Sequence, residues 1–172
     1  MSKIVHLLQD SPISDQLIEN FSLVDSDHLF VVLCEDISEL KYIKSNNSNV
    51  HFFDFEKEDF DELLLKNSVK GVLTHGMFPL SIELLFNLNR DVKIGWFMWG
   101  GDMYHLPKIH SKLYGRKTRQ FLKTSDFKSF IIKELLNFGW IRQAISKLSR
   151  NRVDSITKQL MVIKKVSFFV TY

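Results

Sequence analysis

The stretch VKGVLTHGMFPLSIELLFNLNRDVKIGWFMWGGD, residues 69–102, decides the fold of this chain. It contains an apolar run at 69–74, a helical pattern at 79–89 that begins with a proline, and a second apolar run at 92–99. Such runs are typical of strands buried on both faces, and proline suits the first turn of a helix. The connection is too long for a hairpin, so the stretch predicts two parallel strands joined by a helix.

The same alternation extends toward the N-terminus. Further strands are predicted at residues 3–8, 29–33 and 50–55. Helices are predicted after a cap at Ser14 or Asp15, over residues 37–43 and over residues 59–66. Strands that alternate with helices at this spacing indicate right-handed crossovers. The predicted fold class is therefore α/β, a Rossmann-like parallel sheet with helices on both faces.

The pattern changes after Tyr104. Residues 105–125 are basic and aromatic, residues 127–150 have the apolar stripe of a long helix, and a short helix is expected near 154–161. An apolar strand is predicted at 166–172, where the sequence stops. A domain that ends on such a strand looks truncated. We therefore expect residues 1–172 to form a single domain at the N-terminal end of a longer protein.

Charge is distributed unevenly along the chain. Residues 1–102 contain 8 Lys and Arg against 17 Asp and Glu, whereas residues 103–172 contain 15 Lys and Arg against 3 Asp and Glu. The basic portion favours a phosphate-bearing or membrane-surface partner. The alternative is that the acidic and basic surfaces attract each other within one fold.

The single cysteine, Cys34, has no partner for an internal disulfide, which fits a reducing, cytoplasmic compartment. The N-terminus shows no signal-peptide pattern. No apolar run approaches the ~20 residues needed to cross a bilayer. The sequence thus predicts a protein that touches a membrane at most and does not span one.

Two glycine-containing segments are the best candidates for a site, because ligands of open α/β sheets bind beyond the carboxyl ends of the strands. His75 follows one predicted strand, and Gly76 lets the backbone turn or approach a ligand closely. An imidazole there suits a base, or a donor to a hydroxyl or phosphate oxygen. The alternative is a histidine that caps a helix or holds its own loop.

The second segment follows the next predicted strand. Gly100 and Gly101 permit close approach of a ligand, and Asp102 is suited to accept hydrogen bonds from sugar hydroxyls or to act as a base. The alternative role of Asp102 is to cap the next turn. Tyr104 is placed to line a cleft, whereas Trp96 and Trp99 are expected in the core rather than as a platform for a ligand.

A basic cluster formed by Arg116, Lys117 and Arg119 is a candidate for binding pyrophosphate or anionic headgroups, the alternative being a solvated face. His6 is expected to be a satisfied core histidine. His105 and His110 lack the cysteine or carboxylate spacing of a metal site, so no bound metal is predicted.

Several nucleotide and hydrolase signatures are missing. No Gly-x-Gly-x-x-Gly follows the first strand, where Gln9-Asp10-Ser11-Pro12 stands, and no Walker A pattern is present. The Gly-x-Ser-x-Gly elbow is also missing. These observations argue against a dehydrogenase, a P-loop NTPase and an α/β-hydrolase.

The two glycine breaks resemble those of the TDP-N-acetylfucosamine:lipid II N-acetylfucosaminyltransferase family, whose members build enterobacterial common antigen and related surface glycans. That family shows a His-Gly-x-Phe segment, here 75–78, and an aromatic strand ending Trp-Gly-x-Asp-x-Tyr, here 99–104 with a second glycine. The segments His6-Leu7-Leu8, Asp10-Ser11-Pro12 and Lys112-Leu113-Tyr114 are also similar, as is the closing Phe168-Phe169-Val170-Thr171.

The resemblance implies a glycosyltransferase of the two-domain GT-B type, in which this chain is the acceptor-side N-terminal half and the donor-binding C-terminal half is absent. It implies transfer of an N-acetylated deoxysugar from a nucleotide sugar, such as a TDP-sugar, to a lipid-linked glycan acceptor. His75 and Asp102 would be catalytic and would contact the acceptor hydroxyl or donor sugar. The glycines, Tyr104 and the basic cluster would bind substrate.

The resemblance further implies a peripheral location at the cytoplasmic face of the inner membrane, with no cofactor, metal or nucleic-acid partner. The alternative function is a non-catalytic Rossmann-like module that docks an acidic protein or an anionic membrane through its basic portion. A second α/β domain beyond Tyr172 would favour the transferase.

Overall fold

A computed structural model describes residues 3–24, 27–34, 36, 38, 40–43, 48–99, 101–104, 106, 120, 135, 138, 140–141, 144 and 155–171. The chain divides into two compact units, which are considered separately. The first comprises Met1–Trp99 with Met161–Tyr172, and the second comprises Gly100–Leu160.

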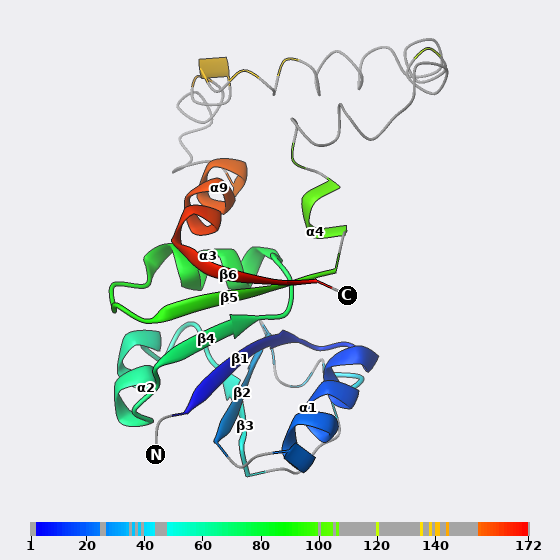
Figure 1. Cartoon of the computed structure of the whole chain (residues 1–172), viewed down its shortest axis with the longest axis vertical. Coiled ribbons are helices and arrows are strands. Elements are labelled where there is room, and N and C mark those ends of the chain that lie inside the picture. Colours follow the sequence, from blue (N-terminus) through cyan, green and yellow to red (C-terminus); the bar gives the residue numbers. More distant parts are fainter. Residues whose placement is uncertain are drawn as a thin grey trace. The chain divides into compact units, whose positions relative to one another are not determined.

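The first unit is built on a parallel sheet of six strands in the order β3-β2-β1-β4-β5-β6 (Figure 1). Every neighbouring pair runs parallel. The chain leaves β1 in one direction and returns to start β4 on its other side, so the switch point of the sheet lies between β1 and β4. The predicted α/β class is confirmed. The strands are β1 Ile4–Gln9, β2 His28–Leu33, β3 Val50–Phe53, β4 Gly71–Thr74, β5 Lys93–Met98 and β6 Val166–Thr171.

The helices are α1 Pro12–Val24, α2 Phe60–Lys66, α3 Pro79–Asn87, α4 Gly101–Tyr104 and α9 Ser155–Lys165. Right-handed crossovers place α1 on one face of the sheet and α2 and α3 on the other, because the strand order advances in opposite directions on the two sides of β1. Figure 1 shows α1 and α2 on opposite sides of β1. The carboxyl ends of all six strands therefore share one edge of the sheet, here called the rim.

The side chains between α1 and the sheet form a single apolar core. Buried side chains from β1, β2 and α1 form one cluster, with partly buried residues such as Phe21 packed against it. The alternation of the strands sends every second residue to this face. The buried members of the cluster are Leu8, Ile18, Phe30, Val32 and Ile43.

The helix α1 begins earlier than expected from a cap at Ser14 or Asp15. Its first residue is Pro12, and the backbone N–H of Ser14 donates to Oγ of Ser11 at 3.2 Å. Proline has no N–H to leave unpaired and already holds a helical φ, so it starts the helix. Ser11 rather than Ser14 therefore supplies the side-chain cap.

The helix expected at 37–43 is absent over the described residues 40–43. Instead, the N–H groups of Lys41, Tyr42 and Ile43 donate to the carboxylate of Asp10, the shortest contact being 2.6 Å from Lys41. A carboxylate that accepts several N–H groups holds the segment in a non-helical form. The apolar spacing at 37–43 reports only local periodicity, so it predicts a helix. It contains no sign that the distant Asp10 carboxylate binds these N–H groups.

The strand–helix–strand unit of residues 69–102 forms as predicted. Pro79 opens α3, and the C-terminal carbonyls of that helix receive the Nζ of Lys165, 3.1 Å from Leu85 O and 2.9 Å from Phe86 O. A cation at a helix C-terminus is favoured by the helix dipole. Trp96 is buried, as expected of a core residue, whereas the core position expected for Trp99 is wrong: this side chain is 36% exposed because it follows the last residue of β5 at the rim.

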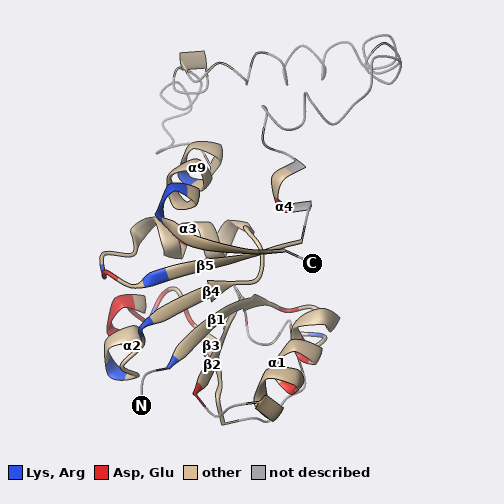
Figure 2. Ribbon diagram, in the orientation of Figure 1, with Lys and Arg blue, Asp and Glu red and all other residues tan. Residues whose placement is uncertain are grey.

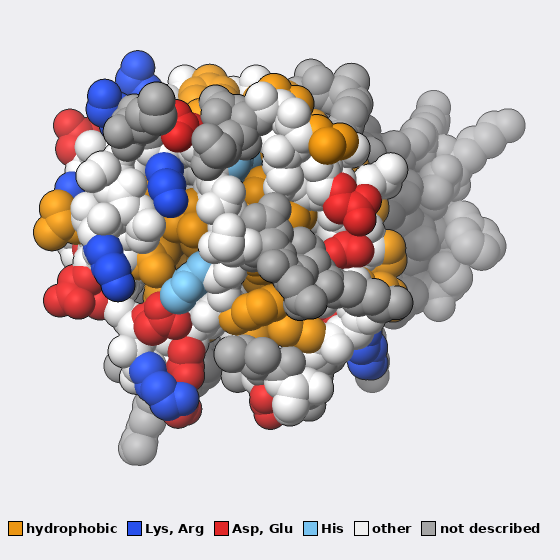
Figure 3. Space-filling view, turned by 90° about the horizontal axis from the view of Figure 1, so that it is seen from below, with side chains coloured by type: hydrophobic (Ala, Val, Ile, Leu, Met, Phe, Trp, Pro, Cys, Tyr) orange, Lys and Arg blue, Asp and Glu red, His pale blue; other side chains and the backbone are white. Residues whose placement is uncertain are grey.

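Acidic side chains lie on α1 and α2 and basic ones on α9 (Figure 2). On the face drawn in Figure 3, acidic and basic side chains are interspersed among hydrophobic ones. In the part of the chain that the structure describes, no helix has the length and apolar character needed to cross a bilayer. The basic segment 105–125 and the long helix predicted at 127–150 lie almost wholly outside the described residues.

Candidate functional site

The loop that follows β4 carries His75 at the rim. The backbone N–H of His75 donates to Leu7 O at 3.0 Å, which extends the pairing of β4 with β1 by one residue. Gly76 then turns the chain at a φ of 116°, a conformation that side-chain-bearing residues rarely adopt. The predicted turning role of Gly76 is therefore confirmed.

Two hydroxyls hold this loop in place. Thr74 Oγ1 donates to Gly76 O at 2.7 Å, and Ser81 Oγ lies 3.1 Å from the same carbonyl oxygen. Thr74 and Ser81 are both buried, so these contacts are shielded from water. The backbone around His75 is thus fixed from the strand on one side and from α3 on the other.

Three histidines form a continuous hydrogen-bonded chain across the sheet. His6 Nδ1 lies 2.8 Å from His75 Nε2, and His6 Nε2 lies 2.8 Å from His28 Nδ1. His6 belongs to β1, His28 begins β2, and His75 follows β4. We call these three residues the histidine chain; it runs from the rim at His75 to the amino end of β2 at His28.

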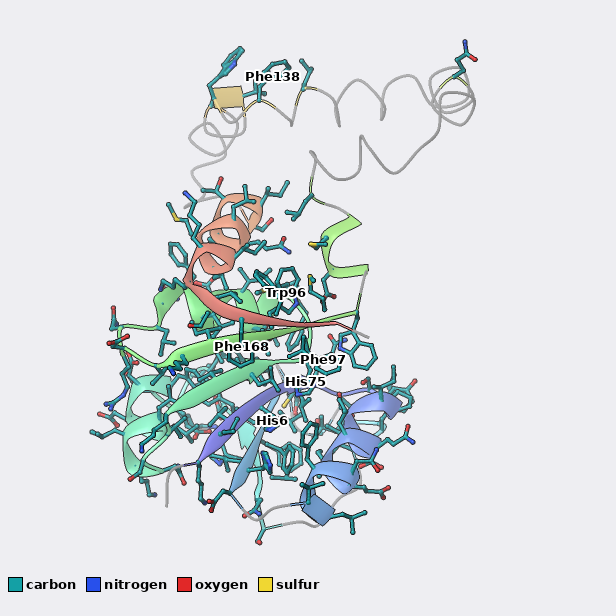
Figure 4. The ribbon with its side chains drawn as sticks, viewed as in Figure 1. His6, His75, Trp96, Phe97, Phe138 and Phe168 are labelled. Atoms are coloured by element: carbon teal, nitrogen blue, oxygen red, sulfur yellow. The ribbon has the colours of Figure 1, made fainter. Side chains whose placement is uncertain are left out.

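Aromatic rings enclose the histidine chain. The ring of Phe21, from α1, is 4.6 Å from the ring of His6, and Phe97, from β5, stacks on His75 at 5.3 Å with an interplanar angle of 18°. Figure 4 shows His6, His75 and Phe97 on neighbouring strands. In the described part of the chain, the hydrogen bonds of the His6 and His75 side chains are the ones that the imidazoles make with one another.

Burial keeps the His6 and His75 rings uncharged at neutral pH. Burial, together with the proximity of the His75 and His28 rings, lowers the pKa of His6 to about 2, because burial disfavours the charged form and like charges repel. Burial also lowers the pKa of His75 to about 4. Both imidazoles are therefore neutral at pH 7, and each carries one N–H and one lone pair.

Neutral rings allow only two arrangements of the protons. If His75 Nε2 donates to His6, then His6 Nε2 donates to His28, and His75 Nδ1 is left with a lone pair. If His28 Nδ1 donates instead, both bonds reverse and His75 Nδ1 bears the hydrogen. His75 Nδ1 is buried and has no hydrogen-bond partner in the part of the chain that the structure describes.

The geometry of the histidine chain does not suit a single metal ion. His6 points opposite ring nitrogens at its two neighbours, so no one point lies between all three rings. Among the described residues, no group of three His, Cys, Asp or Glu side chains is arranged to hold a metal. The three rings are instead joined to one another by the two hydrogen bonds through His6.

The rim beside β1 differs from a nucleotide-binding turn. There Ser11 O accepts the N–H groups of Ser14 and Asp15, at 3.1 and 3.3 Å, and Pro12 has no N–H to offer. The neighbouring Asp10 carboxylate is negative: burial acts to raise its pKa, but three backbone N–H groups outweigh burial and lower it. A pyrophosphate, which binds at free N–H groups of a helix N-terminus, is therefore disfavoured here.

The other predicted site residues belong to the second compact unit or lie outside the described residues. Asp102 sits in the first turn of α4, where its backbone carbonyl accepts a hydrogen bond from Gln159 Nε2 at 3.1 Å. Gly101 begins α4 and Tyr104 ends it, but their side-chain environments are not described. That His75 and Asp102 act on one substrate stays a prediction. Outside the described residues lie Gly100, Arg116, Lys117 and Arg119.

Sequence reasoning placed His6 correctly in the core but missed its two imidazole partners. A signal for one of them was present. In the parallel register His28 lies opposite Ile4, and Ile4 and His6 face the same side of the sheet. Aligning the first two predicted strands would therefore have brought His6 and His28 together on one face.

Comparison of the chain with models of protein families, with curated proteins and with solved structures found no significant match.

Proposed function

We propose that this chain is the acceptor-side half of a glycosyltransferase. It would help to move an N-acetylated deoxysugar from a nucleotide sugar to a lipid-linked glycan. The observation that carries the proposal is His75 Nδ1, a buried nitrogen that has no hydrogen-bond partner among the described residues and lies at the carboxyl end of β4, beside the switch point of the sheet. A neutral imidazole with a lone pair at that atom is suited to remove a proton from a hydroxyl.

The charge at the rim supports the acceptor role over a nucleotide-binding role. Asp10, Asp36 and Asp54 follow β1, β2 and β3, respectively, and Lys57 pairs with Asp54 at 2.6 Å, so carboxylates outnumber the lysine paired with them on that side of the rim. Carboxylates accept hydrogen bonds from sugar hydroxyls and repel phosphates. A glycan fits such a rim, whereas the diphosphate of the donor would be held by another part of the enzyme.

In the proposed reaction the acceptor hydroxyl attacks C1 of the donor sugar. The hydroxyl oxygen forms the new bond to C1, and the bond from C1 to the phosphate oxygen breaks, with its electron pair leaving on the nucleoside diphosphate. The hydroxyl proton passes to His75 Nδ1. Asp102 is proposed to hold the acceptor hydroxyl or the donor sugar.

The remaining proposed roles are those that the family resemblance, which is most specific over residues 74–104, implies for other residues of the chain. Gly76 and the glycines at 100–101 would let the backbone approach the substrate, and Tyr104 would line the cleft. The basic cluster at 116–119 would meet the pyrophosphate of the lipid-linked acceptor at the cytoplasmic face of the inner membrane. The identity of the sugar as N-acetylfucosamine rests on the same resemblance.

The proposal is tested by incubating the native protein with TDP-linked N-acetylated deoxysugars and a lipid-linked acceptor, and by detecting the elongated lipid with mass spectrometry. We expect a product one sugar longer than the acceptor. The same reaction without acceptor serves as the control for donor hydrolysis. Failure to elongate any acceptor across the donor panel would contradict the proposal and favour a non-catalytic binding module.

A further inference from the structure

The histidine chain connects two places that differ in exposure. His75 is buried at the rim, His6 is buried within β1, and His28 is only partly buried at the start of β2. Both contacts between the rings are 2.8 Å, within hydrogen-bonding distance. Figure 4 shows the labelled His6 and His75 next to each other, below Phe97. The chain thus leads from the candidate base to an imidazole that reaches solvent.

We propose that His6 and His28 are positioning residues that relay the proton taken up by His75 to solvent at the amino end of β2. This inference rests on the proposed function, in which His75 is the base. In the ready state His75 Nε2–H donates to His6 Nδ1, His6 Nε2–H donates to His28 Nδ1, and His28 bears its remaining proton on Nε2. His75 Nδ1 then holds the lone pair that meets the substrate hydroxyl.

The protons balance in a single shift. As the substrate proton joins His75 Nδ1, the proton on His75 Nε2 moves to His6 Nδ1. In the same shift the proton on His6 Nε2 moves to His28 Nδ1, and the proton on His28 Nε2 passes to water. One proton enters, one leaves, and every ring ends neutral. After product departs, water returns a proton to His28 Nε2, both shared protons shift back, and the proton on His75 Nδ1 leaves to water at the rim, which restores the ready state.

Burial explains why a relay is needed. A proton kept on His75 or His6 would place an uncompensated charge among aromatic rings, which is costly. The lowered pKa values of these two rings express that cost. Moving the proton outward through neutral rings avoids a buried imidazolium, so a weakly basic His75 can still remove a proton.

His28 Nδ1 contacts His6, so the other ring nitrogen, Nε2, is the atom from which the proton would pass to water. The described contacts of His28 are the imidazole of His6, the ring of Phe21 at 5.3 Å and the ring of Phe30 at 6.3 Å. The charged residues nearest to it along the paired strands are Asp27, which precedes it, and Lys3, which precedes its strand partner Ile4.

The relay has a consequence that is independent of any reaction. In any state in which both nitrogens of His28 bear hydrogen, its Nδ1 must donate to His6 Nε2. His6 then donates from Nδ1 to His75 Nε2. His75 is thereby forced into the form with hydrogen on Nδ1, although His75 itself remains neutral.

We would test this with ¹⁵N NMR of the histidine rings as the pH is lowered from about 8 to about 5, where imidazoles commonly titrate. We expect the His75 Nδ1 signal to change from acceptor type to donor type while the ring stays neutral. His28→Asn keeps an oxygen acceptor close to the Nδ1 position but cannot pass a proton. In that variant the His75 signal should not change. The matched control, His51→Gln, removes a histidine outside the chain and should preserve the wild-type change.

A His75 signal that is independent of pH in the wild-type protein would overturn the relay. So would an equal response in His28→Asn and wild type. If transfer occurs as proposed, His28→Asn should also lower kcat by about 100-fold with KM unchanged, at the lower end of the contribution of general acid–base catalysis. Transfer with unchanged kcat in His28→Asn overturns the relay alone, whereas coupled NMR signals without any transfer overturn the proposed function alone.

Discussion

His6 Nδ1 and His75 Nε2 lie 2.8 Å apart, joining a residue from the middle of the sheet to one at its rim. One of the two nitrogens must donate to the other, so the tautomer of His6 dictates that of His75. Among the described residues, no charged group raises the pKa of either ring. Because both rings are neutral in the folded protein, protonating either of them, including the candidate base His75, lowers the stability of the fold.

Acid should destabilise the protein through these two rings. Histidines of the unfolded chain take up protons below about pH 6.5, whereas the folded pKa values are about 4 for His75 and about 2 for His6. Between the folded pKa of each ring and about pH 6.5, the unfolded state binds more protons than the folded state. The free energy of unfolding is therefore highest above about pH 6.5 and decreases as the pH falls below it. We expect a loss of roughly 2 kcal/mol for each ring between pH 7 and pH 5.

Urea unfolding at both pH values measures this loss. In His6→Phe one of the two rings no longer titrates, so the difference in unfolding free energy between pH 7 and pH 5 should shrink by roughly 2 kcal/mol. Equal pH dependence in His6→Phe and wild type would show that His6 is not held neutral by the fold.

A methyl group at Gly95 should be poorly tolerated. A Cβ there would lie within 3.0 Å of the Phe168 ring and of Leu73 Cδ1, so these side chains or the backbone that carries them would have to shift. We expect Gly95→Ala to lower the free energy of unfolding by about 1–3 kcal/mol. Denaturant unfolding of the variant provides the measurement.

Gly71→Ala is the matched control for Gly95→Ala. A Cβ at Gly71 would meet only Lys93 O, at an ordinary 3.6 Å. Its effect should stay within about 0.5 kcal/mol. Comparable destabilisation by the two variants would contradict the packing of Phe168 over β5.

Lys165 should stabilise the end of α3. Its Nζ donates to the carbonyls of Leu85, Phe86 and Leu88, at 3.1, 2.9 and 3.2 Å. Lys165→Met removes these bonds and should cost about 1 kcal/mol, because the contacts are partly exposed. The same change at the neighbouring, exposed Lys164 should have a smaller effect in thermal unfolding, and the reverse order would refute the assignment.

Asp10 should control the segment that follows β2. In Asp10→Ala the N–H groups of Tyr42 and Ile43 lose their acceptor, so hydrogen exchange at both amides should accelerate by at least about tenfold. Amides of β4 serve as an internal reference. Unchanged exchange at Tyr42 and Ile43 would mean that the carboxylate does not hold them.

Local patterns were sufficient to predict the sheet. The apolar runs around Val72 and Trp96 are long enough to mark buried strands, and Pro79 marks where the helix between them begins. These signals depend on neighbours in sequence, which is why the parallel α/β architecture could be predicted from residues alone.

The features that the sequence did not reveal depend on contacts between distant residues. Asp10 prevents a helix at residues 40–43 through bonds that span more than 30 positions. The bond between His6 and His75 spans 69 positions and exists only after β1 and β4 have paired in register. His75 and Gly76 were found because glycine after a strand is a local signal, whereas the other members of the histidine chain carry none.

The most direct test of the central claim is the rate of sugar transfer by the native protein with and without the His75 imidazole. His75→Gln should lower kcat by about 100-fold or more, in line with loss of a general base, while circular dichroism shows an intact fold. His51→Gln, on the other side of the sheet's centre, should retain the wild-type rate. A folded His75→Gln protein that transfers sugar at a near-wild-type rate would contradict the account.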